Sequence, residues 1–207
     1  MTELKYDVQA LFAEPIFKAD IGHAITPQQV DYIKRLKMVQ NDANLISENL
    51  YIFEEPELRS IKNAVHEALD LFATEVMGIP QKLYVTQSWS LLNHPRIGMH
   101  THSHSNSVVS GSLYFTDLPE PPARMVFSRA RTYQQIDLQP DQAKQNIYNT
   151  PVNVHVPQKN QVVLFASDLT HMVEANRSEE PRYSIAFNTF VKGTIGGYRN
   201  VSQLILE

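Results

Sequence analysis

The sequence predicts a mainly β domain, a barrel or sandwich of short strands supported by an N-terminal helical layer. The chain has 207 residues, the length of one ordinary domain, and 43% of them are hydrophobic, which is enough for a packed core. Helical spacing of apolar residues is confined to the first eighty positions, and period-two and β-branched runs fill most of the rest. We therefore expect a single domain over 1–207, with helical support at about 25–80 and the barrel core at about 83–191.

Local signals predict the N-terminal elements. Apolar residues within 7–20 indicate one or two short strands. Thr26 is a helix cap followed by a proline at the first helical position, and this helix is expected to run to about Gln40. A second helix opens at Pro56, and its apolar residues recur at spacings of three and four until Gly78 supplies a C-terminal stop.

After position 80 the pattern changes to that of short strands. The expected strands are residues 83–92, 98–104, 108–116, 124–128, 152–156, 161–166, 171–175 and 183–191. Short strands at this density are typical of a sandwich or barrel rather than a parallel sheet. The polar stretch 129–150 is expected to form a long loop, in which Tyr133 and Tyr148 either cover a substrate or pack on the barrel.

Composition excludes several classes of function. The chain has no cysteine, so disulfides, zinc-thiolate sites, iron–sulfur clusters and cysteine nucleophiles are excluded. Its net charge of −4 gives no electrostatic support for nucleic-acid binding. No apolar run reaches the roughly 18–20 residues of a membrane span, and the polar N-terminus differs from a signal peptide. We expect a cytoplasmic protein with no membrane partner.

Four of the eight histidines fall between positions 94 and 104. His100, His102 and His104 alternate, and alternate residues of an extended strand project from one face. Adjacent imidazoles repel one another when protonated, and a divalent metal would explain the cluster because imidazole suits zinc, copper, iron and nickel. A solvated polar strand face is the alternative. The candidate distant ligand is His171, for which a structural role is the alternative.

The strand expected near the C-terminus carries a charge on one face. Arg182 and Ser184 share that face, and Tyr183 and Ile185 lie on the apolar one. A buried arginine is costly unless it meets an anion. A ligand carboxylate would suit it, because the guanidinium offers a bidentate fork and the serine hydroxyl a further donor. An internal ion pair with Asp or Glu explains the pattern equally well.

Taken in order, these features resemble the Fe(II)/2-oxoglutarate-dependent oxygenases, and more narrowly a bacterial and phage group among them. The resemblance covers roughly 85–190. Its blocks are Ser88-Trp89 with Asn93 and Gly98, His102-Ser-His104, Ser107-Val-Val-Ser-Gly-Ser-Leu-Tyr-Phe115, Val163-Leu-Phe165, His171-Met-Val173 and Arg182-Tyr-Ser-Ile-Ala-Phe-Asn188. The resemblance implies a double-stranded β-helix, a jelly-roll or cupin-like barrel.

The resemblance also implies two sets of site residues, and no catalytic residue beyond the metal ligands. The implied Fe(II) ligands are His102, His104 and His171. The far carboxylate of the cosubstrate 2-oxoglutarate would be held by Arg182, Ser184 and the hydroxyl of Tyr114. His104 stands where the wider family has Asp or Glu, which leaves the metal's identity open. His100 with His102 is the alternative pair, and Asp168 or Glu174 could supply a carboxylate, although neither matches the motif.

The implied activity is that of a dioxygenase that hydroxylates a substrate and releases succinate and CO₂. The substrate would be a small molecule or a peptide, and the helical layer could serve a homodimer. The alternative is a non-enzymatic or differently metallated cupin-like barrel, in which the three histidines hold zinc, nickel or manganese. A third reading is a structural barrel with exposed histidines. Arg182 with Ser184 favours the oxygenase, because a plain metal binder does not need them. Trp89 and Asn93 share a strand face that either lines the pocket or belongs to the core.

Overall fold

The computed structural model describes residues 4–129 and 140–206. Its two α-helices are α1 (Pro27–Lys34) and α2 (Arg59–Leu71), the latter continued by a π-helical turn (Phe72–Met77). Its strands are β1 (Ile16–Asp20), β2 (Met38–Gln40), β3 (Leu45–Ser47), β4 (Lys82–Asn93), β5 (Met99–His102), β6 (Val109–Tyr114), β7 (Met125–Ser128), β8 (Val152–His155), β9 (Gln161–Ala166), β10 (His171–Val173), β11 (Arg182–Ile195) and β12 (Leu204–Leu206).

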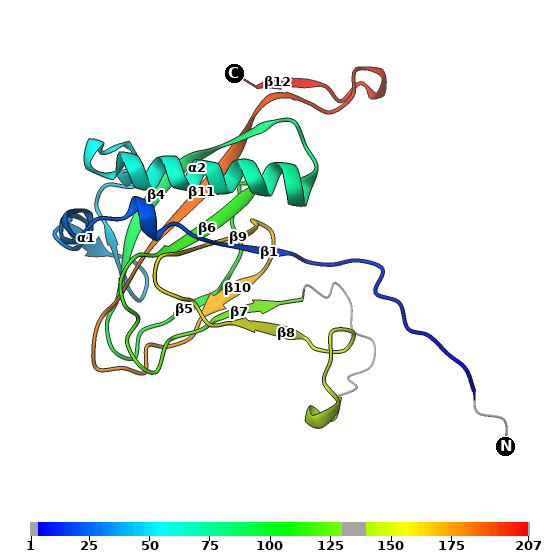
Figure 1. Ribbon diagram of the computed structural model, residues 1–207, viewed down its shortest axis with the longest axis horizontal. Helices are drawn as coiled ribbons and strands as arrows, with labels where there is room; N and C mark the ends of the chain where they lie inside the picture. The colour runs from blue at the N-terminus through cyan, green and yellow to red at the C-terminus, as the bar shows by residue number, and fades with distance from the viewer. Residues whose placement is uncertain (1–3, 130–139, 207) are drawn as a thin grey trace.

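These strands form two antiparallel sheets. The larger has the order β1-β9-β6-β11-β4-β3-β2, with β12 added to β11, and the smaller has the order β5-β10-β7-β8. From β4 to β11 the chain passes back and forth between the sheets, with only β7 and β8 following each other within one sheet. This alternation is the double-stranded β-helix, so the predicted fold class is confirmed (Figure 1).

Two hydrophobic clusters fix the layers. The larger cluster lies between α2 and the outer face of the larger sheet. In Figure 1, α2 crosses this sheet over β4 and β11. The smaller lies between the two sheets and includes Tyr114, Met125, Phe127, Val163 and Phe165. The predicted helical layer is therefore present, and the space between the sheets remains available for a site.

The helix boundaries follow local chemistry. Thr26 caps α1 with a complete capping box, in which its side chain and that of Gln29 each bond the other's backbone N–H. The helix ends at Lys34, earlier than the predicted Gln40, because residues 38–40 form β2 instead. The second helical segment ends as predicted at Gly78, whose φ of +64° is the left-handed conformation that glycine favours.

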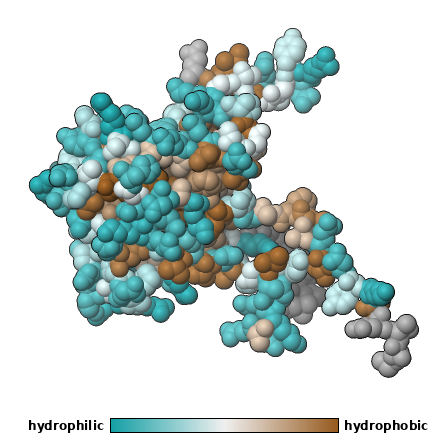
Figure 2. Space-filling view, in the orientation of Figure 1, coloured by the Kyte–Doolittle hydropathy of each residue, from teal (hydrophilic) through white to brown (hydrophobic). Residues whose placement is uncertain are grey.

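The face of the molecule shown in Figure 2 carries both hydrophilic and apolar residues. In Figure 2 hydrophilic residues cover most of the body, and apolar groups also reach the surface on the projecting terminal segments. Phe12 and Val201, near the two ends, are each 95% exposed. Among the described residues, no helix is both long and apolar enough to cross a bilayer.

Candidate metal centre

Three histidines converge on the cavity between the sheets. His102 ends β5 and His171 begins β10, and the two residues are direct partners in the antiparallel pairing of these strands. His104 lies two residues beyond β5, where its backbone N–H donates to the carbonyl of Ser167 at 2.8 Å. The potential ligand atoms of the three histidines all lie within 4.8 Å of one another. Side chains about seventy positions apart in the sequence thus lie close enough to bind one metal ion.

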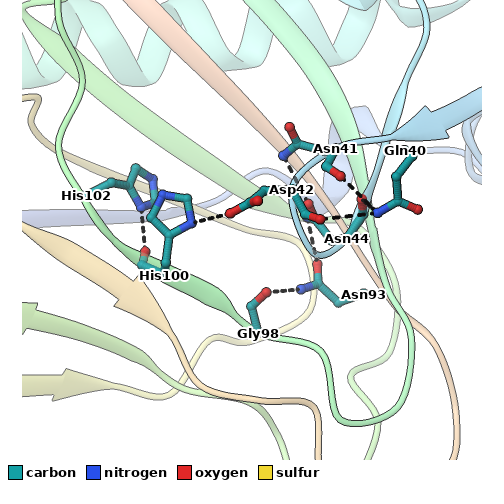
Figure 3. A network of polar contacts seen from close by, with 8 residues as sticks. All are labelled: Gln40, Asn41, Asp42, Asn44, Asn93, Gly98, His100 and His102. Carbon is teal, nitrogen blue, oxygen red and sulfur yellow. Dashed lines mark hydrogen bonds and ion pairs between the residues drawn. The ribbon is translucent and has the colours of Figure 1, made fainter.

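The structure corrects the local geometry expected from the sequence. Residues 98–104 were expected to form one strand, but β5 spans Met99–His102. His104 therefore shares the cavity through the loop that follows β5, and not through strand alternation. His100 does not belong to the convergent group. Its Nδ1 lies 3.3 Å from Oδ2 of Asp42, and both side chains are exposed (Figure 3).

Backbone carbonyls orient two of the imidazoles. Nδ1 of His102 lies 2.7 Å from the carbonyl of His100, and Nδ1 of His171 lies 2.9 Å from the carbonyl of Leu169. A carbonyl only accepts, so each Nδ1 carries the hydrogen and each Nε2 keeps a free lone pair. This is the arrangement by which proteins orient histidines that bind metals.

Burial keeps the inner imidazoles neutral. It lowers the pKa of His104 to about 4, with repulsion from His171 and His102 adding to the effect. Burial also lowers the pKa of His171 to about 4, against the opposing effect of its bond to Leu169. Both rings are therefore uncharged near neutral pH, and the uncharged ring is the form that ligates a metal.

The same cavity holds a buried cation. Arg182, the first residue of β11, is 3% exposed, and its Nε has no hydrogen-bond partner among the described residues. The guanidinium carbon lies 5.0 Å from the ring centroid of Tyr114. No described carboxylate lies within ion-pair distance of Arg182. The internal ion pair that the sequence left open is thus absent from this part of the chain.

Tyr114 and Ser184 complete this end of the cavity. Both are buried, and both line the cavity together with the three histidines and Arg182. Burial raises the pKa of the Tyr114 hydroxyl, although the nearby charge of Arg182 opposes the shift. The phenol therefore remains a hydrogen-bond donor at neutral pH. The residues that the sequence suggested for a diacid do lie together.

One wall of the cavity combines two residues that the sequence offered as pocket or core with one that it missed, Asn44. Trp89 and Asn93 of β4 line it, and Asn44 reaches it from the turn between β2 and β3. The Asn44 amide donates to the Asn93 side-chain oxygen at 3.4 Å, and Asn93 donates to the carbonyl of Gly98 at 3.3 Å (Figure 3). Asn44 lies outside every block of the resemblance, and the hairpin that carries it was expected to be partly helix.

The remaining candidates lie elsewhere. The two side-chain oxygens of Glu174 bond the guanidinium of Arg124, so this carboxylate already has a partner at the surface. Asp168 is not part of the convergent group. The hydroxyl of Tyr148 donates to the carbonyl of Val8 at 3.1 Å, and Tyr133 lies outside the described residues.

Comparison with known proteins gives a family match and a set of similar folds. The family model described as "Putative 2OG-Fe(II) oxygenase" matches residues 87–188. No curated protein matches the chain. A 2OG-Fe(II) oxygenase-family oxidoreductase from Burkholderia pseudomallei is 12% identical, with a TM-score of 0.59 over 84% of this chain and 83% of that one.

Two further solved structures carry the same fold. The epimerase SnoN from nogalamycin biosynthesis is 14% identical, with a TM-score of 0.61 over 86% of this chain and 76% of that one. HygX from Streptomyces hygroscopicus, solved with nickel, 2-oxoglutarate and hygromycin B, is 12% identical, with a TM-score of 0.58 over 85% of this chain and 82% of that one. At these identities the likeness shows a shared fold.

Proposed function

We propose that this chain, whose residues 87–188 match the 2OG-Fe(II) oxygenase family model, is an Fe(II)/2-oxoglutarate-dependent oxygenase that hydroxylates a small-molecule or peptide substrate. The reaction consumes dioxygen, 2-oxoglutarate and a C–H bond, and gives succinate, CO₂ and an alcohol. The observation that carries the proposal is the presence, in one cavity, of three convergent imidazoles and a buried arginine that has no anionic partner among the described residues.

The histidine group suits a catalytic divalent ion. His102, His104 and His171 would hold it through neutral nitrogens, and three protein ligands leave coordination positions for other molecules. When bound, such a centre supplies the oxidising chemistry, and the protein's part is to bind, orient and exclude water. In His102 and His171 the hydrogen bond from Nδ1 to a backbone carbonyl orients the ring and leaves the lone pair of Nε2 free to bind the metal.

The arginine end of the cavity suits the far carboxylate of 2-oxoglutarate. Arg182 would bind it through the guanidinium, whose buried Nε has no hydrogen-bond partner in the described part of the chain. Such charge-assisted bonds are among the strongest hydrogen bonds in proteins. Ser184 and the protonated hydroxyl of Tyr114 would add neutral donors. A carboxylate at this point would remove the desolvation penalty that Arg182 otherwise bears.

Related folds support a small-molecule substrate and leave the outcome of the reaction open to test. HygX was solved with hygromycin B, and SnoN with nogalamycin RO. Similar structures also include an epimerase and a carbocyclase, so hydroxylation is the part of the proposal that most needs a product assay. We further propose that 1–207 acts as a single cytoplasmic domain.

The decisive experiment is anaerobic binding. Protein given Fe(II) and 2-oxoglutarate should develop a visible metal-to-ligand absorption band. The Arg182→Ala variant should keep metal binding and lose cosubstrate affinity, and His171→Ala should lose both. Arg124→Ala is the matched control, because it removes an arginine that pairs with Glu174 at the surface. Normal metal binding without any response to 2-oxoglutarate would favour the alternative, a differently metallated cupin-like barrel.

A further inference from the structure

A single turn contacts both parts of the histidine group. This turn, residues 167–170, joins β9 to β10 (Figure 1). At its start, the carbonyl of Ser167 accepts from the backbone N–H of His104 at 2.8 Å. Near its end, the carbonyl of Leu169 holds Nδ1 of His171 at 2.9 Å. The turn therefore fixes the backbone of one histidine and the ring of another.

Ser167 makes three hydrogen bonds to the loop that carries His104. Besides the bond from the His104 N–H, its own N–H donates to the carbonyl of Val108 at 3.2 Å. Its hydroxyl donates to the hydroxyl of Ser107 at 2.7 Å. Because β5 ends at His102, no pairing of β5 with another strand holds His104, and these bonds replace it. Ser167 is only 1% exposed, so water competes little for them.

The hydroxyl of Ser167 belongs to a short buried chain. It lies 2.8 Å from the hydroxyl of Ser110, a residue of β6 that lines the cavity. The hydroxyl of Ser107 in turn donates to the carbonyl of Val109 at 3.2 Å. The Ser110 hydroxyl also reaches the side-chain oxygen of Asn188 at 3.0 Å, so its one hydrogen serves either Asn188 or Ser167. Removing the Ser167 hydroxyl takes one hydrogen-bond partner from the buried Ser110 hydroxyl and one from the half-buried Ser107 hydroxyl.

We propose that Ser167 is a positioning residue, which holds His104 where it can share a metal ion with His102 and His171. The inference rests on the proposed metal centre and is independent of the chemistry at Arg182. Without its hydroxyl, Ser167 holds the loop by its two backbone bonds alone, to His104 and Val108. His104 then occupies its ligating position for less of the time, and the apparent affinity for metal falls.

Cobalt(II) is the probe, because its visible spectrum reports both affinity and coordination geometry. The Ser167→Ala variant should bind cobalt(II) about tenfold more weakly, within the range found for other residues that orient metal ligands, and with an altered spectrum. Ser107→Ala, which breaks the same bond from the other side, should show the same two changes. Ser167→Thr keeps the hydroxyl and should restore both.

The matched control is Ser178→Ala. Ser178 is also buried, and its hydroxyl accepts from the nearby N–H of Glu180 at 3.0 Å. This variant should keep the parent spectrum even if its melting temperature falls as far as that of Ser167→Ala. If Ser167→Ala keeps the parent affinity and spectrum while losing only thermal stability, the residue is merely structural and the inference is wrong. If His104→Ala itself binds cobalt(II) normally, the proposed metal centre fails first.

Discussion

Replacing Arg182 with methionine should move two measurements in opposite directions. The substitution removes the charge and keeps a long side chain of roughly similar volume. In the protein without ligand, Arg182 is a buried cation, and the residues that the structure describes offer neither a carboxylate partner for its charge nor a hydrogen-bond partner for its Nε. With 2-oxoglutarate bound, the same cation would face the far carboxylate. Loss of the charge should therefore weaken cosubstrate binding and stabilise the free protein.

The magnitudes follow from the surroundings of Arg182. Truncating one member of a buried, hydrogen-bonded charge pair costs about 2–5 kcal/mol. At about 1.4 kcal/mol per tenfold, 2-oxoglutarate should bind at least about 30-fold more weakly. In the free protein, removal of an uncompensated charge should raise the free energy of unfolding by about 1–4 kcal/mol. Loss of the cation–π contact with the Tyr114 ring should lower it by about 0.5–2 kcal/mol. We expect a net stabilisation of about 1 kcal/mol.

Two assays measure these effects independently. Anaerobic titration of the Fe(II)-loaded protein gives the affinity for 2-oxoglutarate, and urea unfolding of the metal-free protein gives the free energy of unfolding. Arg124→Met should change neither by much, because Arg124 belongs to a partly exposed pair with Glu174. An unchanged affinity in Arg182→Met would refute the assignment. A free protein weakened by several kcal/mol would show that Arg182 serves the fold.

Three further predictions test other parts of the structure. The metal-free protein should lose stability as the pH falls from about 6.5 to about 4, by up to about 3 kcal/mol for His171. In this pH range the imidazole of His171 is protonated in the unfolded chain but stays neutral in the folded chain, where its pKa is about 4. A free energy of unfolding in urea that does not change with pH would contradict the burial of neutral imidazoles. His100→Ala should leave cobalt(II) affinity within about twofold of the parent, in contrast to His104→Ala, and a large loss would restore His100 as a ligand. Gly111→Ala should lower the melting temperature by about 4 °C in calorimetry, because its new Cβ would lie 2.2 Å from Cζ of Phe187, and an unchanged value would mean that the ring relaxes freely.

The sequence predicts those elements whose signals are local. The second helix has apolar residues at helical spacing and a glycine stop, and its course matches α2 with the π-helical turn up to Gly78. The core strands were placed to within a few residues, because alternation persists through them. The fold class followed from their density and from the order of the motif blocks. The convergence of His102 and His171 follows from that same order, although no local pattern contains it.

The missed elements depend on distant partners. Strands β2 and β3 are three residues each, too short to show a period, and they exist because β3 pairs with the edge of β4. For this reason the pattern after Thr26 predicts a helix through Gln40, whereas α1 ends at Lys34. Asn44, which the resulting turn carries into the cavity, was missed for this reason. His104 shows the same limit, since a backbone bond to Ser167 and not the expected strand places it.

The cavity has two unusual features, a ligand group of three histidines without a carboxylate and a buried arginine, and the charge balance of the site connects them. Three neutral imidazoles would leave a divalent ion its full double charge, where a carboxylate ligand would remove one unit. Arg182 adds a further positive charge, and no described carboxylate offsets it. A monoanion would leave two positive charges buried, whereas a dianion that reaches both the metal and the guanidinium leaves one. A site of this composition therefore discriminates in favour of a diacid, and binding of the metal and of the diacid should reinforce each other.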